Sequence, residues 1–111
     1  MRIAKFNDMT NGWFVGGFIP TAYNTSDFEV GYLTHKKDSK WPAHYHKEAT
    51  EINLLVKGKM TVNGKTLNKG DIFVIYPDEV SSPKFIEDCE IVCVKIPSVP
   101  GDKYEYIKKS E

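Results

Sequence analysis

The sequence consists of short apolar runs separated by turn signals, and no window of useful length has the periodicity of an amphipathic helix. Residues 28–35 alternate between apolar and polar side chains, which predicts a strand. Asn63-Gly64 is the strongest hairpin signal, because both residues accept the positive φ of a type I′ turn. The run Ile72-Phe73-Val74-Ile75 is continuously apolar, so we expect a strand buried on both faces or nearly so. The pattern predicts an all-β sandwich or barrel with little or no helix.

The length and composition suit one domain with a real core. The chain has 111 residues, of which 41% are hydrophobic and 13% aromatic. There is no internal repeat and no linker long enough to divide it. We therefore predict a single domain over residues 1–111, with its central part at about 28–96. From residue 97 the composition shifts to proline, glycine and charged residues, which predicts an extended tail over 97–111 with frayed last residues.

The charge balance excludes several classes of partner. Lys+Arg and Asp+Glu both number 15, so nothing indicates binding to nucleic acid or to an anionic membrane. Arg2 is the only arginine, and this scarcity disfavours a nucleotide sugar that is held through its diphosphate. We expect no nucleotide cofactor. No signal peptide or membrane span is visible, so a cytoplasmic protein is expected.

The two cysteines are predicted to be reduced. Cys89 and Cys93 fall in one apolar run, where the strand rise would separate their Cα atoms by about 13 Å. A disulfide tolerates at most about 7 Å. Buried free thiols are therefore expected.

The stretch from His44 to Gly58 carries the chemistry of the chain. His44 and His46 are two residues apart, so on a strand their side chains point to the same face. Glu51 opens the next apolar run, and if it faces inward then Asn53 and Leu55 do so too. Two imidazoles and one carboxylate can form a cup for a divalent metal such as Zn, Fe, Mn or Ni.

This spacing resembles the first motif of the cupin family, G-x5-H-x-H-x(3–4)-E-x6-G. His44, His46, Glu51 and Gly58 match it in type and spacing, and Asp38 stands at the leading glycine position. The resemblance implies a small double-sheeted β-barrel, the cupin jelly roll.

The second motif of that family, G-x5-P-x-G-x2-H-x3-N, is matched only at its start. It aligns from Gly70, but its proline position holds Tyr76 and its glycine position holds Asp78. Ser81 stands at the position of the histidine and Phe85 at that of the asparagine. The resemblance therefore implies a jelly roll whose metal site lacks the fourth ligand of the family.

Two interpretations of the cup follow from these residues. Three protein ligands can hold a metal and leave positions open for water or substrate. Alternatively, the same side chains hydrogen-bond one another and line a pocket without metal. Four further residues are predicted to line the cup, namely Tyr32, Asn53, Tyr76 and Ser81. The third histidine, His35, is expected at the surface or at a strand edge.

The resemblance implies several functions. The first is the binding of a small molecule, such as a sugar or a small acid, in the barrel mouth. The second is a metal-dependent enzyme, a dioxygenase or an isomerase. The third is a metal-free sugar epimerase or ketoisomerase, with His46 as base and Tyr76 or Tyr32 as acid. A fourth is an appendage domain whose relatives are fused to sugar-handling enzymes.

We also expect a homodimer. Cupins often dimerise through sheet edges or exchanged terminal strands. The apolar run Trp13–Ile19 could pair across such a dimer.

Overall fold

The computed structural model describes residues 1–107 and consists almost entirely of strands, which confirms the all-β prediction. A single 3-10 turn, η1 (Phe6–Asp8), precedes them. The strands are β1 (Trp13–Val15), β2 (Glu29–His35), β3 (His44–Tyr45), β4 (Thr50–Lys57), β5 (Lys59–Val62), β6 (Lys65–Asn68), β7 (Ile72–Ile75), β8 (Pro83–Phe85), β9 (Cys89–Ile96) and β10 (Tyr104–Glu105). Over the same described range, no helix has the length and hydropathy to cross a membrane.

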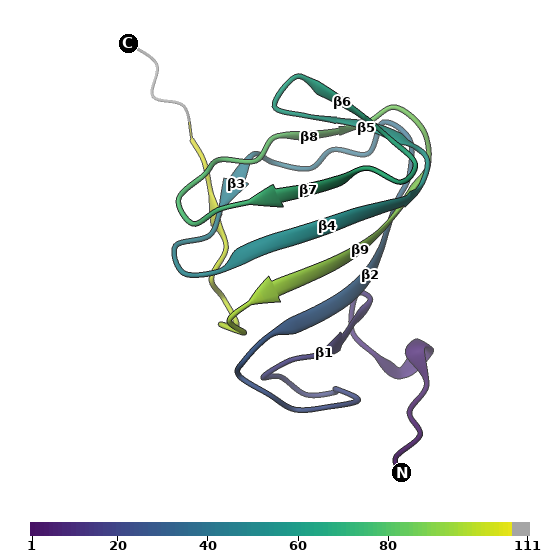
Figure 1. Cartoon of the computed structure of the whole chain (residues 1–111), viewed down its shortest axis with the longest axis vertical. Coiled ribbons are helices and arrows are strands. Elements are labelled where there is room, and N and C mark those ends of the chain that lie inside the picture. Colours follow the sequence, from purple (N-terminus) through teal and green to yellow (C-terminus); the bar gives the residue numbers. More distant parts are fainter. Residues whose placement is uncertain (108–111) are drawn as a thin grey trace.

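Three antiparallel sheets form the barrel (Figure 1). The largest sheet has the strand order β1-β2-β9-β4-β7 and makes one wall. A three-stranded sheet, β6-β5-β8, and a two-stranded sheet, β10-β3, complete it. Strand β10 comes from the segment predicted as an extended tail, and its pairing with β3 brings that segment back onto the body of the barrel. The predicted fraying of the last residues concerns 108–111, which lie outside the described residues.

The turns follow the predicted chemistry. Asn63 and Gly64 have φ of 53° and 79°, as a type I′ hairpin between β5 and β6 requires. Asp38 and Asp78, which stand at the two glycine positions of the motifs, have φ of 62° and 66°. Aspartate tolerates this left-handed conformation better than most residues, so both turns survive the loss of glycine. At Gly58, with φ of 94°, a Cβ atom would lie only 2.2 Å from the Asp88 carbonyl oxygen, so only glycine fits.

The core lies between the large sheet and the three-stranded sheet. Its buried members are Leu55, Met60, Val62, Ile75, Phe85, Cys89 and Ile91. Residues directly opposite each other in an antiparallel pair share a face, and Asn53, Cys93 and Phe73 stand in one such row. Glu51, Asn53 and Leu55 therefore face inward together, as the alternation predicted.

The expectation that Ile72–Ile75 is buried on both faces is wrong. Ile72 is 66% exposed, whereas Ile75 is 5% exposed. Strand β7 is the last strand of the large sheet, and only one face of that sheet packs on the barrel interior. A continuous apolar run therefore marks a sheet whose outer face is also apolar.

Candidate metal centre

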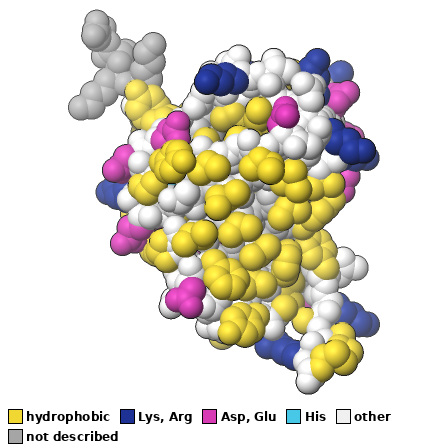
Figure 2. All heavy atoms as spheres, viewed as in Figure 1, with side chains coloured by type: hydrophobic (Ala, Val, Ile, Leu, Met, Phe, Trp, Pro, Cys, Tyr) yellow, Lys and Arg dark blue, Asp and Glu magenta, His cyan; other side chains and the backbone are white. Residues whose placement is uncertain are grey.

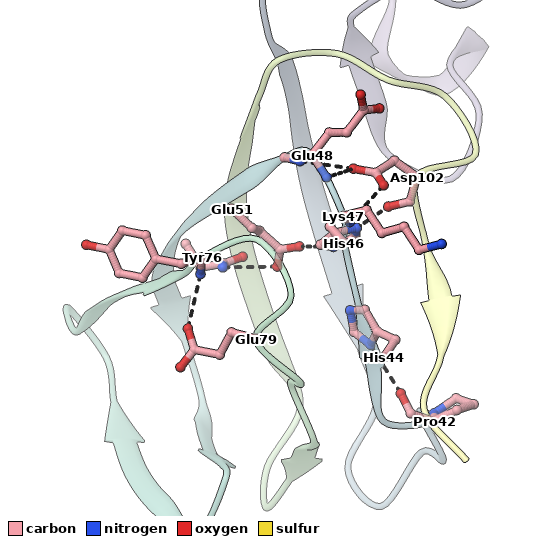
Figure 3. Close-up of polar contacts among 11 residues, drawn as sticks. Pro42, His44, His46, Lys47, Glu48, Glu51, Tyr76, Glu79 and Asp102 are labelled. Carbon is pink, nitrogen blue, oxygen red and sulfur yellow. Dashed lines mark hydrogen bonds and ion pairs between the residues drawn. The ribbon is translucent and has the colours of Figure 1, made fainter.

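Strands β3 and β4 bring His44, His46 and Glu51 together. Their potential ligand atoms all lie within 4.8 Å of one another, and Figure 3 shows the three side chains converging. The two histidines are 8% and 2% exposed. Tyr45, between them, turns to the other side and stacks on Tyr104, with ring centroids 5.5 Å apart.

Hydrogen bonds to backbone carbonyls set the tautomer of both histidines. His44 Nδ1 lies 3.2 Å from the Pro42 oxygen, and His46 Nδ1 contacts the Asp102 oxygen. A carbonyl oxygen can only accept, so each Nδ1 carries a proton and donates it. The lone pair available for a metal is then on Nε2 in both rings, which is the arrangement that second-shell contacts produce in metal sites.

Glu51 is held as a carboxylate in this cluster. Burial by itself would raise its pKa, but the hydrogen bond with His46 and the charge of Lys95 lower the pKa to about 2. Its Oε2 lies 2.8 Å from His46 Nε2, and its Oε1 accepts a hydrogen bond of 3.1 Å from Asn53 Nδ2. An ionised carboxylate beside two imidazole nitrogens is a donor set for a divalent cation.

The contact between His46 and Glu51 bears directly on whether a metal fits. With Nδ1 protonated, His46 Nε2 can face a carboxylate oxygen at 2.8 Å only if a second proton or a metal ion lies between them. Neighbouring ligand atoms of one metal, each at about 2.0 to 2.2 Å from it, lie about 2.8 to 3.6 Å apart. His46 and Glu51 already have such a spacing, 2.8 Å, and the wider separations of up to 4.8 Å in the cluster would have to shorten by about 1 Å for all three side chains to bind one ion.

Asp102 supports the site, and sequence analysis missed it. Its side chain accepts hydrogen bonds from the backbone N–H groups of Lys47, Glu48 and Ala49 at 2.9, 3.0 and 3.0 Å. Burial raises the pKa of Asp102, but these three N–H donors outweigh it and the net shift is downward. The Asp102 carbonyl also holds the His46 ring, so this one residue orders both His46 and the loop that leads to Glu51. No local pattern signals this role, because the partners are more than fifty residues apart in the chain.

The cluster lies in a cavity of about 720 Å³ at the barrel mouth. Aromatic side chains make up much of the lining, including Trp13, Trp41, Phe73 and Phe85. Such a volume is in the range of small-molecule sites, which combine an apolar lining with a few polar groups.

Two of the four predicted lining residues lie beside the cluster. Asn53 is 2% exposed and bonds to Glu51, as described above. Ser81 lines the cavity and pairs with His44 through two backbone hydrogen bonds of 2.8 and 3.0 Å. The position that holds a histidine in the second family motif is therefore beside His44, with a hydroxyl in its place.

The two tyrosines lie differently. Tyr32 borders the cavity, but it is paired with Val92 on the outward row of the large sheet, where its hydroxyl donates to Glu90 Oε1 at 2.8 Å. Tyr76 is 61% exposed, does not line the cavity, and points away from the cluster in Figure 3.

His35 lines the cavity at the end of β2. Its ring stacks on Phe85 with centroids 4.3 Å apart, and Trp41 packs against its edge. Burial, and then the charge of Lys103, lower the pKa of His35. His35 is therefore a half-buried cavity residue at the end of β2, an interior strand of the large sheet, and not the surface or strand-edge histidine that the sequence predicted.

Neither cysteine forms a disulfide, as predicted. Both are buried and free, and both lie on β9. Burial raises the pKa of the Cys93 thiol, which faces the cavity near Glu51.

No protein-family model matches the sequence, and no curated protein matches it either. Solved structures do match. One is a double-stranded β-helix protein from Klebsiella pneumoniae, with a TM-score of 0.68 and 22% identity, covering 76% of this chain and 74% of that one. Another is an RmlC-like cupin from Shewanella frigidimarina, with a TM-score of 0.60 and 18% identity, covering 68% and 70%. A bacterial pirin from Escherichia coli in complex with nickel(II) has a TM-score of 0.63 and 20% identity, covering 79% of this chain and 39% of that one.

These likenesses bear on the fold, and the site rests on the geometry of this chain. The strand order, the antiparallel sheets and the neighbours agree with the jelly roll that the His44–Gly58 motif implied. The protein has the cupin fold and carries a candidate His-His-Glu metal site.

Proposed function

We propose that this protein binds a divalent metal ion through His44, His46 and Glu51 and uses it to hold a small molecule in the barrel mouth. One observation carries the proposal. Both histidines commit Nδ1 to a backbone carbonyl, so Nε2 is the nitrogen that each ring can offer to a metal, beside an ionised carboxylate. In a vestigial cup nothing would require both rings to present the same nitrogen.

The donor set suits Zn, Fe, Mn or Ni. The pirin neighbour was solved with nickel(II), which supports a metal of this group in a cupin barrel. A metal bound here would supply a Lewis acid for an oxygen atom of the ligand. The aromatic walls of the cavity would bury the body of the ligand, and Asn53 would keep Glu51 oriented.

Metal-dependent catalysis, by a dioxygenase or an isomerase, is the second candidate. The observation that favours it is the number of ligands, because three protein donors leave coordination positions open for a reactant. The metal-free epimerase is not supported by the geometry. It needs a tyrosine acid beside His46, whereas Tyr32 is bonded to Glu90 on the outer face and Tyr76 is outside the cavity.

Metal analysis tests the proposal. Protein purified without chelator is expected to carry a divalent metal, and metal-stripped protein is expected to take up one ion per chain in a calorimetric titration with Zn, Fe, Mn or Ni. Binding should release protons, since a metal replaces any proton between His46 and Glu51. No saturable uptake of any of the four metals at micromolar concentration would contradict the proposal.

A further inference from the structure

Lys95 and Lys103 add two ammonium groups to the cavity that holds the metal cluster. Lys95, on β9, is directly opposite Glu51 in the β4–β9 ladder, so it faces inward, and its Nζ lies 4.7 Å from the Trp13 ring centroid. Lys103, just before β10, has its Nζ 4.1 Å from the Trp41 ring centroid. All four side chains line the cavity. The walls are thus both cationic and aromatic.

Neither lysine is neutralised by a salt bridge. Within residues 1–107 the ion pairs are His46–Glu51 and Lys57–Glu90, and neither involves Lys95 or Lys103. Glu29 neighbours Lys95 across the β2–β9 pair, but it is not part of the cavity lining and accepts the Ser98 hydroxyl. Two positive charges therefore stand in the cavity with free hydrogen-bonding capacity.

The charge of the cavity favours an anion. Its formal charges are Glu51 on one side and Lys95 and Lys103 on the other, which leaves a surplus of positive charge. A divalent metal on the cluster would increase that surplus. An enclosed site of one sign concentrates ligands of the opposite sign.

We propose that the ligand of this cavity is a small organic carboxylate, held by Lys103 and Lys95 while its apolar part packs between Trp13 and Trp41. This inference rests on the proposed function for the metal but names the class of ligand and the residues that select it. A carboxylate can accept a charge-assisted hydrogen bond from a lysine that keeps its contact with an aromatic ring.

Calorimetric titration with malonate and with its uncharged analogue malonamide tests the ligand class. Malonate is expected to bind at least about tenfold more tightly than malonamide. Lys103→Met should weaken malonate binding about tenfold or more, the effect of one charge-assisted hydrogen bond. Lys84→Met is the control, because Lys84 on β8 is exposed and does not line the cavity. Its malonate affinity should match that of the wild type.

The outcomes separate this inference from the metal proposal when each titration is run on metal-loaded and metal-stripped protein. Uptake of metal with no preference for malonate would overturn the carboxylate and leave the metal. A preference for malonate that depends on Lys103, in protein that takes up no metal, would overturn the metal proposal and leave the carboxylate assignment. Equal affinities of Lys103→Met and Lys84→Met, or tighter binding of inorganic phosphate than of malonate, would also overturn the carboxylate assignment.

A second inference comes from the outer face of the large sheet. The outward rows of β2, β9, β4 and β7 pair apolar side chains with one another: Val30, Val94, Ile52 and Val74 in one row, and Tyr32, Val92, Leu54 and Ile72 in the next. We call these eight residues the outer apolar face. Figure 2 shows hydrophobic side chains covering this part of the surface. Leu54 and Ile72 are 37% and 66% exposed.

We infer that the outer apolar face packs against the same face of a second copy of this chain. Four strands about 4.8 Å apart, each contributing a stretch of about 13 Å, give a flat area of about 250 Å², and contiguous apolar patches of a few hundred Å² on a soluble domain are often functional. The face carries no charge, the Lys57–Glu90 pair beyond its end is internally neutral, and the chain has zero net charge, so two copies do not repel. Sheets pack face to face at about 10 Å, and a two-fold axis presents the same patch from both copies.

The free edge of β1 is not available for pairing with a second copy, because the following segment of the same chain already bonds to it. Phe14 and Gly16 bond to Ala22, Tyr23 and Thr25 of the same chain, which cover the side of β1 away from β2. The expected dimer therefore forms through the sheet face rather than by strand addition along Trp13–Ile19.

Light scattering coupled to gel filtration at micromolar concentration tests the dimer. The wild type is expected to elute at twice the mass of one chain, and Ile72→Glu and Leu54→Glu at the mass of one chain. Ile86→Glu is the matched control, since Ile86 is 41% exposed but follows β8 outside the large sheet, and it should remain dimeric. Thermal melts establish that each variant is folded, and Ile72, on the terminal strand, is the more tolerant site. A monomeric wild type, or folded glutamate variants that stay dimeric, would overturn the inference.

Discussion

Replacement of Asp102 by alanine is expected to lower the free energy of unfolding by about 3 kcal/mol. The substitution removes a carboxylate, 6% exposed, that accepts three backbone hydrogen bonds. It also leaves the N–H group of the buried Ala49 without its acceptor, which costs more than the loss of a solvated bond. Urea unfolding followed by fluorescence measures the change.

A conservative variant of Asp102 and a control at another aspartate test whether the three hydrogen bonds cause this loss of stability. Asp102→Asn keeps one acceptor oxygen and should lose less than half as much. Asp88→Ala is the control, because the exposed Asp88 side chain accepts a single hydrogen bond within the described part of the chain, from the Lys37 N–H group at 2.7 Å. Its loss should cost less than about 1 kcal/mol. If Asp102→Ala and Asp88→Ala lowered the free energy of unfolding equally, the three hydrogen bonds of Asp102 would contribute no more to stability than one exposed bond.

The Asp102 contribution should also depend on pH. Its pKa is lower in the folded protein than the ordinary 3.8, so the carboxylate stabilises the fold above the pKa of the unfolded chain. This stability is lost as the pH falls through the lower, folded pKa. The difference between wild type and Asp102→Ala should therefore be full at pH 6 and shrink below about pH 4.

Replacement of His44 by alanine is expected to reduce metal affinity by more than about 100-fold, beyond the 10- to 100-fold effect of second-shell changes. His44 is the better of the two histidines to replace, because among residues 1–107 its side chain bonds only to the Pro42 carbonyl. Removing His46 would also leave Glu51 buried without its partner and destabilise the fold. Calorimetry with the metal that binds the wild type most tightly measures the loss.

His35→Ala is the control for His44→Ala. His35 lines the same cavity and stacks on Phe85, but it does not belong to the three-residue cluster. Its loss should change metal affinity by less than about threefold, since it lies outside the donor set. If both variants lose affinity equally, the ligand set is not His44, His46 and Glu51.

The parts of the fold that could be predicted depend on neighbours in the sequence. The Asn63-Gly64 turn, the inward set of Glu51 with Asn53 and Leu55, and the convergence of His44 with His46 follow from two-residue periodicity and local φ preferences. The double burial of Ile72–Ile75 failed for a physical reason. A run of apolar residues does not distinguish a second protein layer within the chain from an apolar face left on its surface.

The parts of the site that could not be predicted come from segments distant in sequence. Asp102 reaches loop 47–49, Lys103 reaches Trp41, and β10 reaches β3 only because the chain after β9 returns across the barrel mouth. Proline and glycine in this segment predicted irregular backbone, which does not specify where the segment docks. The positions of Tyr32 and Tyr76 could not be predicted for a different reason. A shift of one residue in strand register decides whether a side chain faces the cavity or the outside.

The Asp102 carbonyl also gives the segment after β9 a thermodynamic role. Since Asp102 both docks that segment on loop 47–49 and fixes the ring of His46, docking and ligand orientation are linked equilibria. We expect a ligand that binds at His46 Nε2 to strengthen the docking of strand β10, and a change that loosens β10 to weaken that binding by the same factor. The C-terminal segment is therefore part of the structure around the candidate metal centre, and the linkage predicts that a ligand bound there would stabilise the pairing of β10 with β3.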